Sequence, residues 1–523
     1  MSLGPPLLAL PVLFFGVGLS GCAGSSQPAP APASFLSKET VPSIVIPPTG
    51  WTEDKKSLHA LSRLAYGPRP GDEEVVVRHG VERWIREQMA PARIDDAAVE
   101  AKLQGLQTVS LTIPELFREF PRPQDVAQKN GIDKEGPGAR ERLQELVPPK
   151  KRTAMIGQQL AAAKLVRAVE SRRQLQEVLV DFWFNHFNVF ADKGQDRWMV
   201  GAYERDAIRP NVFGGFRDLL GATAAHPAML FYLDNWTSVR EGARGNPGSG
   251  FPRRGTNENY ARELLELHTL GVSGGYTEED VREVARCFTG WSLVPPRAAM
   301  APAPRGPAAD LEAGSFVYRD AAHDKGEKRV LGTTIPAGGG RADGETVLDL
   351  LVRHPSTART VATKLCRRFV SDDPPPALVA RLAAVFQRTR GDLPSVYAAL
   401  FSSPEFWSDD AFRSKTKTPL ELAASAVRAM GGTVDPAHAT PLAQHVARMG
   451  EPLYRCQPPT GFSDVAETWV NAGALLDRLN FGAVLAAGRI PGVSGDPALL
   501  APGSPDPVRV AALALGSPEF QKR

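Results

Sequence analysis

The sequence is poor in cysteine and lacks the short motifs that mark common zinc sites and phosphate-binding loops. None of its four cysteines is spaced as CxxC, and its nine histidines form no rich tract, so we expect no structural zinc site. HExxH and a phosphate-binding glycine loop are absent, and no two histidines stand four residues apart. A divalent metal site, which we leave open, would therefore need ligands from distant segments.

An excess of charge of one sign is also lacking. The chain has 61 basic and 58 acidic residues, a net charge of +3, and no basic block interleaved with aromatic residues. This balance predicts no attraction to nucleic acid. With 523 residues and 42% hydrophobic content, the chain can form two or three domains, or one large domain with insertions.

Residues 1–22 lack the length and continuity of a membrane-spanning helix. Their apolar run, LGPPLLALPVLFFGVGLSGC, is interrupted by prolines and ends in small residues, as an export signal does. LSGC resembles the bacterial lipobox, so we expect Cys22 to be lipidated and to anchor the protein in a membrane lipid layer of the cell envelope. No Lys or Arg precedes the apolar run, which departs from a typical signal. An unstructured apolar N-terminus is the alternative.

The region after Cys22 predicts a flexible tether. Residues 23–50 are rich in Pro, Ala and Ser and would join the lipid to a folded domain facing the periplasm or the exterior. Export would place Cys287, Cys366 and Cys456 in an oxidising compartment, where at most one disulfide can form among them. The sequence leaves the pairing open.

Apolar residues recur at helical spacing through most of residues 51–523. Examples are the segments 71–89, 171–187, 277–291 and 377–391. Thr277, followed by three acidic residues, predicts a helix start, and Gly271 after ELLELHTL predicts a helix stop. Strand signals are confined to one hairpin, in which 316–318 would pair with 329–335. We therefore predict an all-α, helix-dominated fold with a small antiparallel β-hairpin insertion.

Segments rich in Pro and Gly separate the predicted helices. They predict loop insertions near residues 120–150, 237–256 and 295–315. We interpret residues 51–523 as one helical domain that carries these insertions.

Seven stretches of the sequence, taken in order, resemble a single family. They are RLAYGPRPGD, DFWFNHFNVFADKG, AAHPAMLFYLDN, NENYARELLELHTLGVSGGYTEEDVREVARCFTGWSL, HDKGEKRVLG, RHPSTARTVATKLCRRFVSDDPP and MGEPLYRCQPPTGF. Together they resemble the uncharacterised bacterial family numbered 1800 among the domains of unknown function. The resemblance implies a mostly helical, exported protein, often encoded beside a partner from the secreted family numbered 1501, which is similar to alkaline-phosphatase-type proteins. It implies no established activity and no catalytic residue.

The segment DFWFNHFN places polar side chains in a strongly apolar context. On a continuous helix, Asp181, Asn185, Asn188 and Asp192 would form one polar stripe, while His186 would lie on the apolar face. Burying an amide or imidazole without a partner costs roughly 1 to 3 kcal/mol, so these groups need partners. Either a binding site or ordinary hydrogen bonds to neighbouring helices would supply them.

The segment NENYARELLELH repeats this mixture of polar and apolar residues. Glu258 and Arg262 begin a charge ladder, which an ordinary solvated helix face would also carry. Asn259 and Glu263 lie on an adjacent stripe, and His268 points toward the expected core.

Two further histidines immediately precede prolines. Because proline favours the first helical position, His226 and His354 are predicted N-caps, where the helix dipole disfavours imidazolium. A neutral imidazole there can bind a proton or metal, although the proline alone also explains the position. His323, beside Asp324 in the predicted hairpin loop, is the histidine that we expect to be most exposed.

Two functional classes fit these features. In the first, an accessory envelope lipoprotein presents a polar His/Asn/Glu cleft to a ligand or partner protein, with candidate binding residues Asn185, Asn188, Asn259 and Arg262. The alternative is a metal-dependent or His/carboxylate-based hydrolase. Its candidate catalytic residues are His186, His226, Glu258, Glu263, His268, His323, Asp324 and His354. In either case we predict that Asn185, His186 and Asn188 meet groups from residues 257–268 and from the His-Pro caps.

Overall fold

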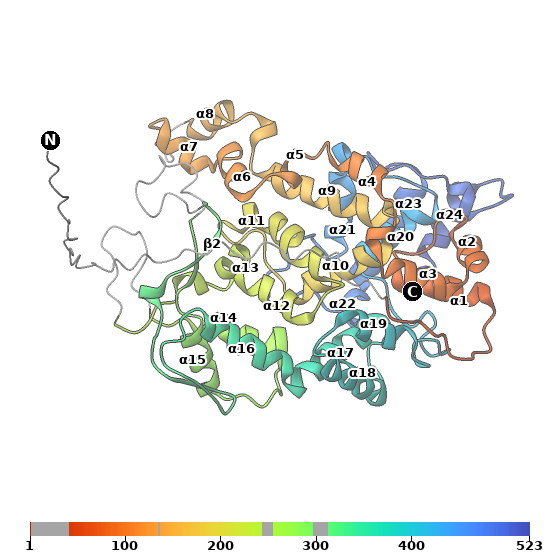
Figure 1. Cartoon of the computed structure of the whole chain (residues 1–523). Coiled ribbons are helices and arrows are strands. Elements are labelled where there is room, and N and C mark those ends of the chain that lie inside the picture. Colours follow the sequence, from red (N-terminus) through yellow and green to blue (C-terminus); the bar gives the residue numbers. More distant parts are fainter. Residues whose placement is uncertain (2–40, 134–135, 137, 243–254, 296–311) are drawn as a thin grey trace. The chain divides into compact units, whose positions relative to one another are not determined.

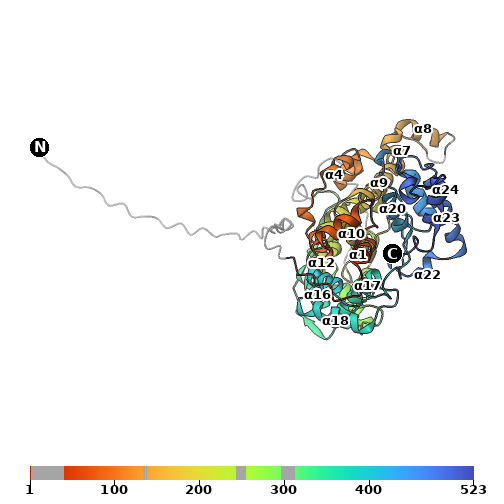
Figure 2. The same cartoon turned by 90° about the vertical axis from the view of Figure 1, so that its right-hand side faces the viewer.

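Helices dominate the chain, as the apolar periodicity predicts (Figure 1). The computed structural model describes residues 1, 41–133, 136, 138–242, 255–295 and 312–523. The predicted export signal with Cys22, and the tether up to residue 40, lie outside the described residues. Figure 2 shows the helical body of residues 41–523 from a second direction. None of the described helices is both long enough and apolar enough to cross a membrane.

Short helices precede two long central ones. Their bounds are α1 (Glu53–Leu64), α2 (Asp72–His79), α3 (Val81–Gln88), η1 (Pro91–Arg93), α4 (Ala97–Leu103), α5 (Gln107–Ser110), α6 (Ile113–Glu119), α7 (Pro123–Lys129), α8 (Ala139–Leu146), η2 (Pro149–Lys151), α9 (Ala154–Glu170) and α10 (Gln174–His186). Gly80, with φ +89°, divides the predicted helix 71–89 into α2 and α3. The insertion predicted near 120–150 contains α7 and α8.

The middle of the chain includes two π-helical turns, η3 and η6. Its elements are α11 (Asp196–Ala202), η3 (Tyr203–Ile208), η4 (Arg209–Asn211), α12 (Phe216–Ala225), α13 (Pro227–Tyr232), η5 (Asn235–Thr237), α14 (Glu258–Glu263), η6 (Leu264–Thr269), α15 (Glu278–Cys287), η8 (Asp320–Ala322), α16 (Ala342–Arg353), α17 (Pro355–Phe369), α18 (Pro376–Arg388) and α19 (Leu393–Phe401). The predicted boundaries are confirmed: Thr277 caps α15 with Asp280 in a capping box, and Gly271 follows η6 with φ +84°.

The last part of the chain ends in a pair of packed helices. Its elements are α20 (Pro419–Ala429), η9 (Pro436–His438), α21 (Thr440–Arg448), α22 (Ala466–Trp469), α23 (Ala472–Ala486), η10 (Pro497–Leu500) and α24 (Pro507–Gly516). α23 and α24 approach closely because glycines lie at their contact. A Cβ on Gly516 would stand 2.8 Å from Leu479 Cδ2.

The described β-structure consists of two separate antiparallel pairs. β1 (Trp291–Leu293) pairs with β2 (Phe316–Tyr318), and β3 (Lys328–Val330) pairs with β4 (Thr333–Ile335). The helix-dominated fold with a small β insertion is therefore confirmed, but the predicted pairing of 316–318 with 329–335 is wrong. The segment before η8 finds its partner in residues that directly follow α15, whereas 328–335 forms a tight hairpin of its own.

α10 lies in the interior and contacts α1, α3, α9 and η3. Leu175, Leu179 and Trp183 are completely buried, and the Trp183 indole donates a hydrogen bond to the Tyr397 hydroxyl at 2.6 Å. The helix ends at His186, so the prediction of a continuous helical stripe through Asn188 and Asp192 is wrong. The chain leaves the helix because the residues after His186 pair with another loop.

Candidate functional site

Two cavities adjoin α10 where the connecting loop 454–465 packs against it. The larger, which we name the α10 cavity, has a volume of about 160 Å³ and is lined by Asn185, His186, Lys364, Arg367, Thr460 and Ser463, among others. The smaller, which we name the inner cavity, has a volume of about 30 Å³ and is lined by Lys164, Asp181, Asn188, Arg368, Glu451 and Tyr454, among others. The two cavities share Phe182, Asn185, Phe462, Ser463 and Asp464.

The two asparagines of DFWFNHFN hold this loop in place. Asn185 donates its amide N–H to the Phe462 carbonyl at 2.8 Å and accepts the Phe462 N–H at 2.7 Å. Asn188 donates to the carbonyls of Cys456 and Pro458 at 2.9 and 2.8 Å. Gly461 permits the close approach, because a Cβ there would stand 2.3 Å from the Asn185 carbonyl oxygen. The polar side chains predicted to need partners therefore find backbone groups of the loop.

His186 is buried and is satisfied on both ring nitrogens. Its Nε2 stands 3.1 Å from the His268 carbonyl oxygen, which can only accept, so Nε2 carries the proton. Nδ1 is then an acceptor, and the Lys364 ammonium lies 3.0 Å from it. Burial, followed by the charge of Lys364, holds the pKa of His186 well below its usual value. His186 is therefore a neutral imidazole that orients Lys364.

Lys364 connects this imidazole to the α10 cavity. Its ammonium donates to His186 Nδ1 and also to the Leu267 carbonyl at 3.2 Å, which leaves one of its three N–H groups for the cavity that it lines. Burial lowers the pKa of Lys364 to about 8, although the Asp464 carboxylate opposes this shift. The ammonium therefore remains charged at neutral pH and loses its proton slightly above it.

Ion pairs surround the inner cavity. The buried Arg368 guanidinium lies 2.9 Å from Glu421, 3.3 Å from Asp464 and 3.5 Å from Asp181. Asp181 also accepts a hydrogen bond from the Lys164 ammonium at 2.9 Å. Asp181 is thus an ionic residue of the interior, held between two cations, and not a residue of a solvated stripe.

Glu451 is the second acid at the inner cavity. It is buried, and its Oε2 accepts the Leu420 N–H at 2.7 Å. Burial, followed by repulsion from the Asp181 carboxylate, raises the pKa of Glu451 to about 8. The cavity lining therefore combines an acid whose pKa is raised with a carboxylate held between two cations, with room for about one water molecule.

The segment 257–268 meets α10 through its backbone. The His268 and Leu267 carbonyls accept from His186 and Lys364, so this contact was predicted, although the side chains were expected to make it. Asn259 donates to the Leu233 carbonyl at 3.3 Å, outside both cavities. The buried His268 side chain has its pKa lowered to about 3 by burial and by Lys364.

The charged residues of this segment lie away from the cavities. Arg262 forms an exposed ion pair with Glu278 at 2.7 Å and stands 3.7 Å from Glu258, which agrees with the solvated charge ladder. Burial, followed by the nearby Glu266 carboxylate, raises the pKa of the half-buried Glu263. Neither Glu258 nor Glu263 lines the α10 cavity or the inner cavity.

Both His-Pro sites are N-caps, as predicted. His226 Nδ1 accepts the Ala228 N–H and His354 Nδ1 accepts the Ser356 N–H, each at 3.2 Å. Burial lowers the pKa of His226 to about 4, and burial also lowers the pKa of His354. The His226 ring packs 5.1 Å from the Tyr203 ring, and neither histidine lines the cavities around α10. The prediction that these caps meet Asn185, His186 and Asn188 is therefore wrong.

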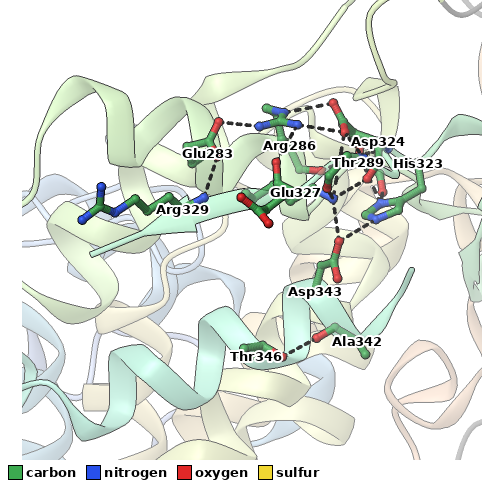
Figure 3. A network of polar contacts seen from close by, with 12 residues as sticks. Glu283, Arg286, Thr289, His323, Asp324, Glu327, Arg329, Ala342, Asp343 and Thr346 are labelled. Carbon is green, nitrogen blue, oxygen red and sulfur yellow. Dashed lines mark hydrogen bonds and ion pairs between the residues drawn. The ribbon is translucent and has the colours of Figure 1, made fainter. Parts of the chain in front are cut away.

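His323 belongs to a separate buried cluster, shown in Figure 3. The expectation that it is exposed is wrong, because its side chain is completely buried. Its Nε2 lies 3.0 Å from Asp343 Oδ2, and its Nδ1 lies 2.8 Å from the Thr289 carbonyl oxygen. The buried Lys328 ammonium also binds Asp343 at 2.6 Å. Asp324 points instead to the Arg286 guanidinium, at 3.0 Å, so the neighbours in sequence do not form a pair.

Sequence reasoning missed most charged residues of the cavities. Lys364 and Arg368 lie on the helical stripe that also carries the buried Thr357 and Val361, so two cations on an apolar stripe were a usable signal. Glu451 follows the end of α21 in an irregular segment, and no periodicity marks it. The segment CQPPTGF contributes Phe462, which lines both cavities.

The described residues include neither a metal-binding cluster nor an exposed thiol. Among the described residues, no group of three or more His, Cys, Asp or Glu side chains is arranged to hold a metal ion. Cys287, Cys366 and Cys456 are buried free thiols, and burial raises the pKa of each.

The fold and its cavities define a class of helical protein in which a core helix and a long loop enclose a polar site. The chain belongs to the family described as protein of unknown function DUF1800, whose model matches residues 59–522. The resemblance stated from the sequence is thereby confirmed. No curated protein and no solved structure matches the chain.

Proposed function

We propose that this chain is an exported, lipid-anchored envelope protein that binds a small anionic ligand in the α10 cavity. The observation that carries the proposal is Lys364, a partly buried ammonium that the neutral His186 and the Leu267 carbonyl orient while one N–H group remains available at the cavity. Such a preoriented cation recognises a carboxylate or phosphate group with little ordering cost.

The remaining lining of the cavity suits the same ligand. Arg367 supplies a second cation, and Thr460 and Ser463 supply hydroxyl groups. Asp464 is the acid of the lining, and its carboxylate is paired with Arg368 at 3.3 Å. A volume of about 160 Å³ corresponds to roughly five water molecules, so the cavity takes a small ion or the charged end of a larger molecule.

Titration calorimetry of the purified full chain with phosphate, sulfate and acetate tests this proposal. We expect saturable binding of at least one anion and at least a tenfold loss in Lys364→Met and in Arg367→Gln, because a hydrogen bond to a charged group is lost. Lys325→Met, which removes an exposed lysine, is the matched control. Because burial lowers the pKa of Lys364 to about 8, affinity should fall as the pH rises through 8. Anion binding that Lys364→Met leaves unchanged would refute the proposal.

The anchor is proposed from LSGC and from the Pro/Ala-rich tether that follows it. Cys22→Ala should move the protein from the membrane fraction into the soluble fraction of the expressing cells, because a lipid chain can no longer be attached. Unchanged partition into membranes would exclude lipidation at Cys22.

A second candidate function, hydrolysis, is favoured by the acids of the inner cavity. The raised pKa of Glu451 favours its protonated form, whereas Asp181 is paired with Lys164 at 2.9 Å, so the first acid can donate a proton and the second can accept one. A panel of ester, phosphoester and glycoside substrates, tested with wild type and Glu451→Gln, decides between the functions. Turnover that Glu451→Gln abolishes supports hydrolysis, and no turnover supports binding alone.

The partner from family 1501 is proposed only from the resemblance. Co-purification of the two proteins, produced together with affinity tags on either one, tests it directly.

A further inference from the structure

A separate and larger groove lies between the N-terminal helices and the end of the chain. It has a volume of about 660 Å³, and residues of α1, α2, α20, η10 and α24, together with the segments 413–417 and 517–522, line it. In Figure 1, α1, α2, α20, α24 and the C-terminus lie on the same side of the body. A volume of this size is typical of a small-molecule site.

Lys417 is the unusual residue of this groove. It is only 7% exposed, and its ammonium forms no hydrogen bond or ion pair with any of the residues that the structure describes. The ammonium lies 3.9 Å from the centre of the Phe520 ring. Its charged neighbours are mainly cations, among them Arg413, Arg478 and Arg523.

The acid closest to Lys417 is already occupied. Glu421 lies 2.9 Å from Arg368 and 3.0 Å from Arg523, so two guanidinium groups share its charge. A buried charge without a counterion is destabilising, and a cation–π contact offsets only part of that cost. Burial lowers the pKa of Lys417 to about 7, and a carboxylate bound in the groove would favour the charged ammonium.

The groove lining also includes acidic side chains, together with the cations Arg69, Arg413 and Lys522. The acids include Asp54 on α1 and Glu73 and Glu74 on α2, and burial, followed by repulsion from Glu74 and Asp54, raises the pKa of Glu73. A ligand cation would relieve that repulsion. Apolar groups, including Leu58 and Leu499, also line the groove.

From this arrangement we propose that the groove binds a zwitterionic ligand, a short peptide with apolar side chains and free termini. Its carboxylate pairs with Lys417, its amino group lies at Asp54, Glu73 and Glu74, and its side chains pack on the apolar groups of the groove. This site is distinct from the α10 cavity, whose lining shares no residue with the groove.

The probe is the dipeptide Leu-Leu, compared with its C-terminal amide and its N-acetyl form, in calorimetric titrations of the purified full chain. We expect one Leu-Leu per chain, at least tenfold weaker binding of the amide because the carboxylate is lost, and weaker binding of the acetylated form. An amide that binds as tightly as Leu-Leu, or a failure of all three to bind at millimolar concentration, would overturn the proposal.

Variants locate the site. The affinity of Lys417→Met for Leu-Leu should be at least tenfold lower than that of wild type, and this variant should bind Leu-Leu and its amide equally. Lys417→Arg keeps a cation and should retain most of the affinity. Lys364→Met, which alters the α10 cavity, should bind Leu-Leu as wild type does. If Lys417→Met fails to fold, the difference between Leu-Leu and its amide on the wild-type chain still decides. Unchanged affinity in a folded Lys417→Met variant would refute the assignment.

Discussion

Two parts of the molecule bury polar groups in different ways. In the His323 cluster, the Lys328 ammonium binds the Asp343 carboxylate and the carbonyls of Asp324 and Gly326, which uses all three of its N–H groups. Around α10, by contrast, Lys364 keeps one N–H group for a cavity of about 160 Å³.

The comparison shows why buried charge alone is a poor sign of function. His323, Asp343 and Thr289 hold the contacts that a hydrolytic triad would need, yet His323 is completely buried and none of the three lines any of the three cavities described above. Around His186 the contacts do not resemble a catalytic triad. The Lys364 ammonium there, however, has one N–H group left for the α10 cavity. A free donor beside a cavity is the feature that separates a candidate site from a structural network.

The largest expected effect is on the stability that the buried His323 cluster contributes. Asp343→Ala leaves the buried Lys328 ammonium with only the Asp324 carboxylate, which lies 4.0 Å away and is bound to Arg286. We therefore expect the free energy of unfolding to fall by about 3 kcal/mol, measured by urea denaturation. The double variant with Lys328→Met should recover much of this loss, since no buried charge then remains. A loss below about 1 kcal/mol would show that the cluster is hydrated and not sealed.

His186→Ala tests the part of the α10 site in which both ring nitrogens have hydrogen-bond partners. The ring lies 4.4 Å from Phe187 and 5.2 Å from Trp183, so its removal leaves a cavity in the core and should cost on the order of 3 kcal/mol. His186→Phe, which keeps an aromatic ring but no acceptor for Lys364, separates packing from hydrogen bonding. Equal stability of the Phe variant and wild type would show that the contact with Lys364 contributes little.

Glu451 should make stability depend on pH. Its pKa is raised to about 8 in the folded chain, whereas an unfolded glutamate has a pKa of about 4.3, so the folded state binds more protons between these values. Stability is therefore highest below pH 4.3 with respect to this group and declines as the pH rises to 8, by at most about 1.4 kcal/mol per unit.

Glu451→Gln should remove this decline. Denaturation curves of the variant and wild type at pH 5, 6, 7 and 8 should diverge steadily, with the variant becoming relatively more stable. Parallel curves over the whole range would contradict the raised pKa of this buried acid.

The smallest expected effect distinguishes the contribution of the loop 454–465 to anion binding from that of the α10 cavity. Asn185→Ala and Asn188→Ala each remove two hydrogen bonds to the loop 454–465, so each should cost about 1 to 2 kcal/mol in the free energy of unfolding. Asn185 lines the α10 cavity and Asn188 does not, so only Asn185→Ala should also weaken anion binding. Equal losses of affinity in calorimetric titrations would mean that the loop, and not the cavity, sets the affinity.

Local signals in the sequence predicted the helices but not all of their ends. Thr277 and Gly271 mark boundaries through side-chain capping and positive φ, which depend on neighbouring residues alone. The end of α10 at His186 could not be found in this way, because Asn188 leaves the helix to bind the carbonyls of residues 456 and 458, far along the chain. The pairing of β2 with β1 is likewise a contact between segments that a long insertion separates.

The sequence by itself determined the helical fold class, the family, and the need for partners at Asn185, His186 and Asn188, because composition, periodicity and motifs are properties of short segments. Only the tertiary structure decided that loop carbonyls and Lys364 are those partners, that His323 is sealed, and that Lys417 is buried. The physical reason is that desolvation depends on every segment packed around a group. Whether a histidine binds a ligand, caps a helix or packs in the core depends on neighbours that lie hundreds of residues away.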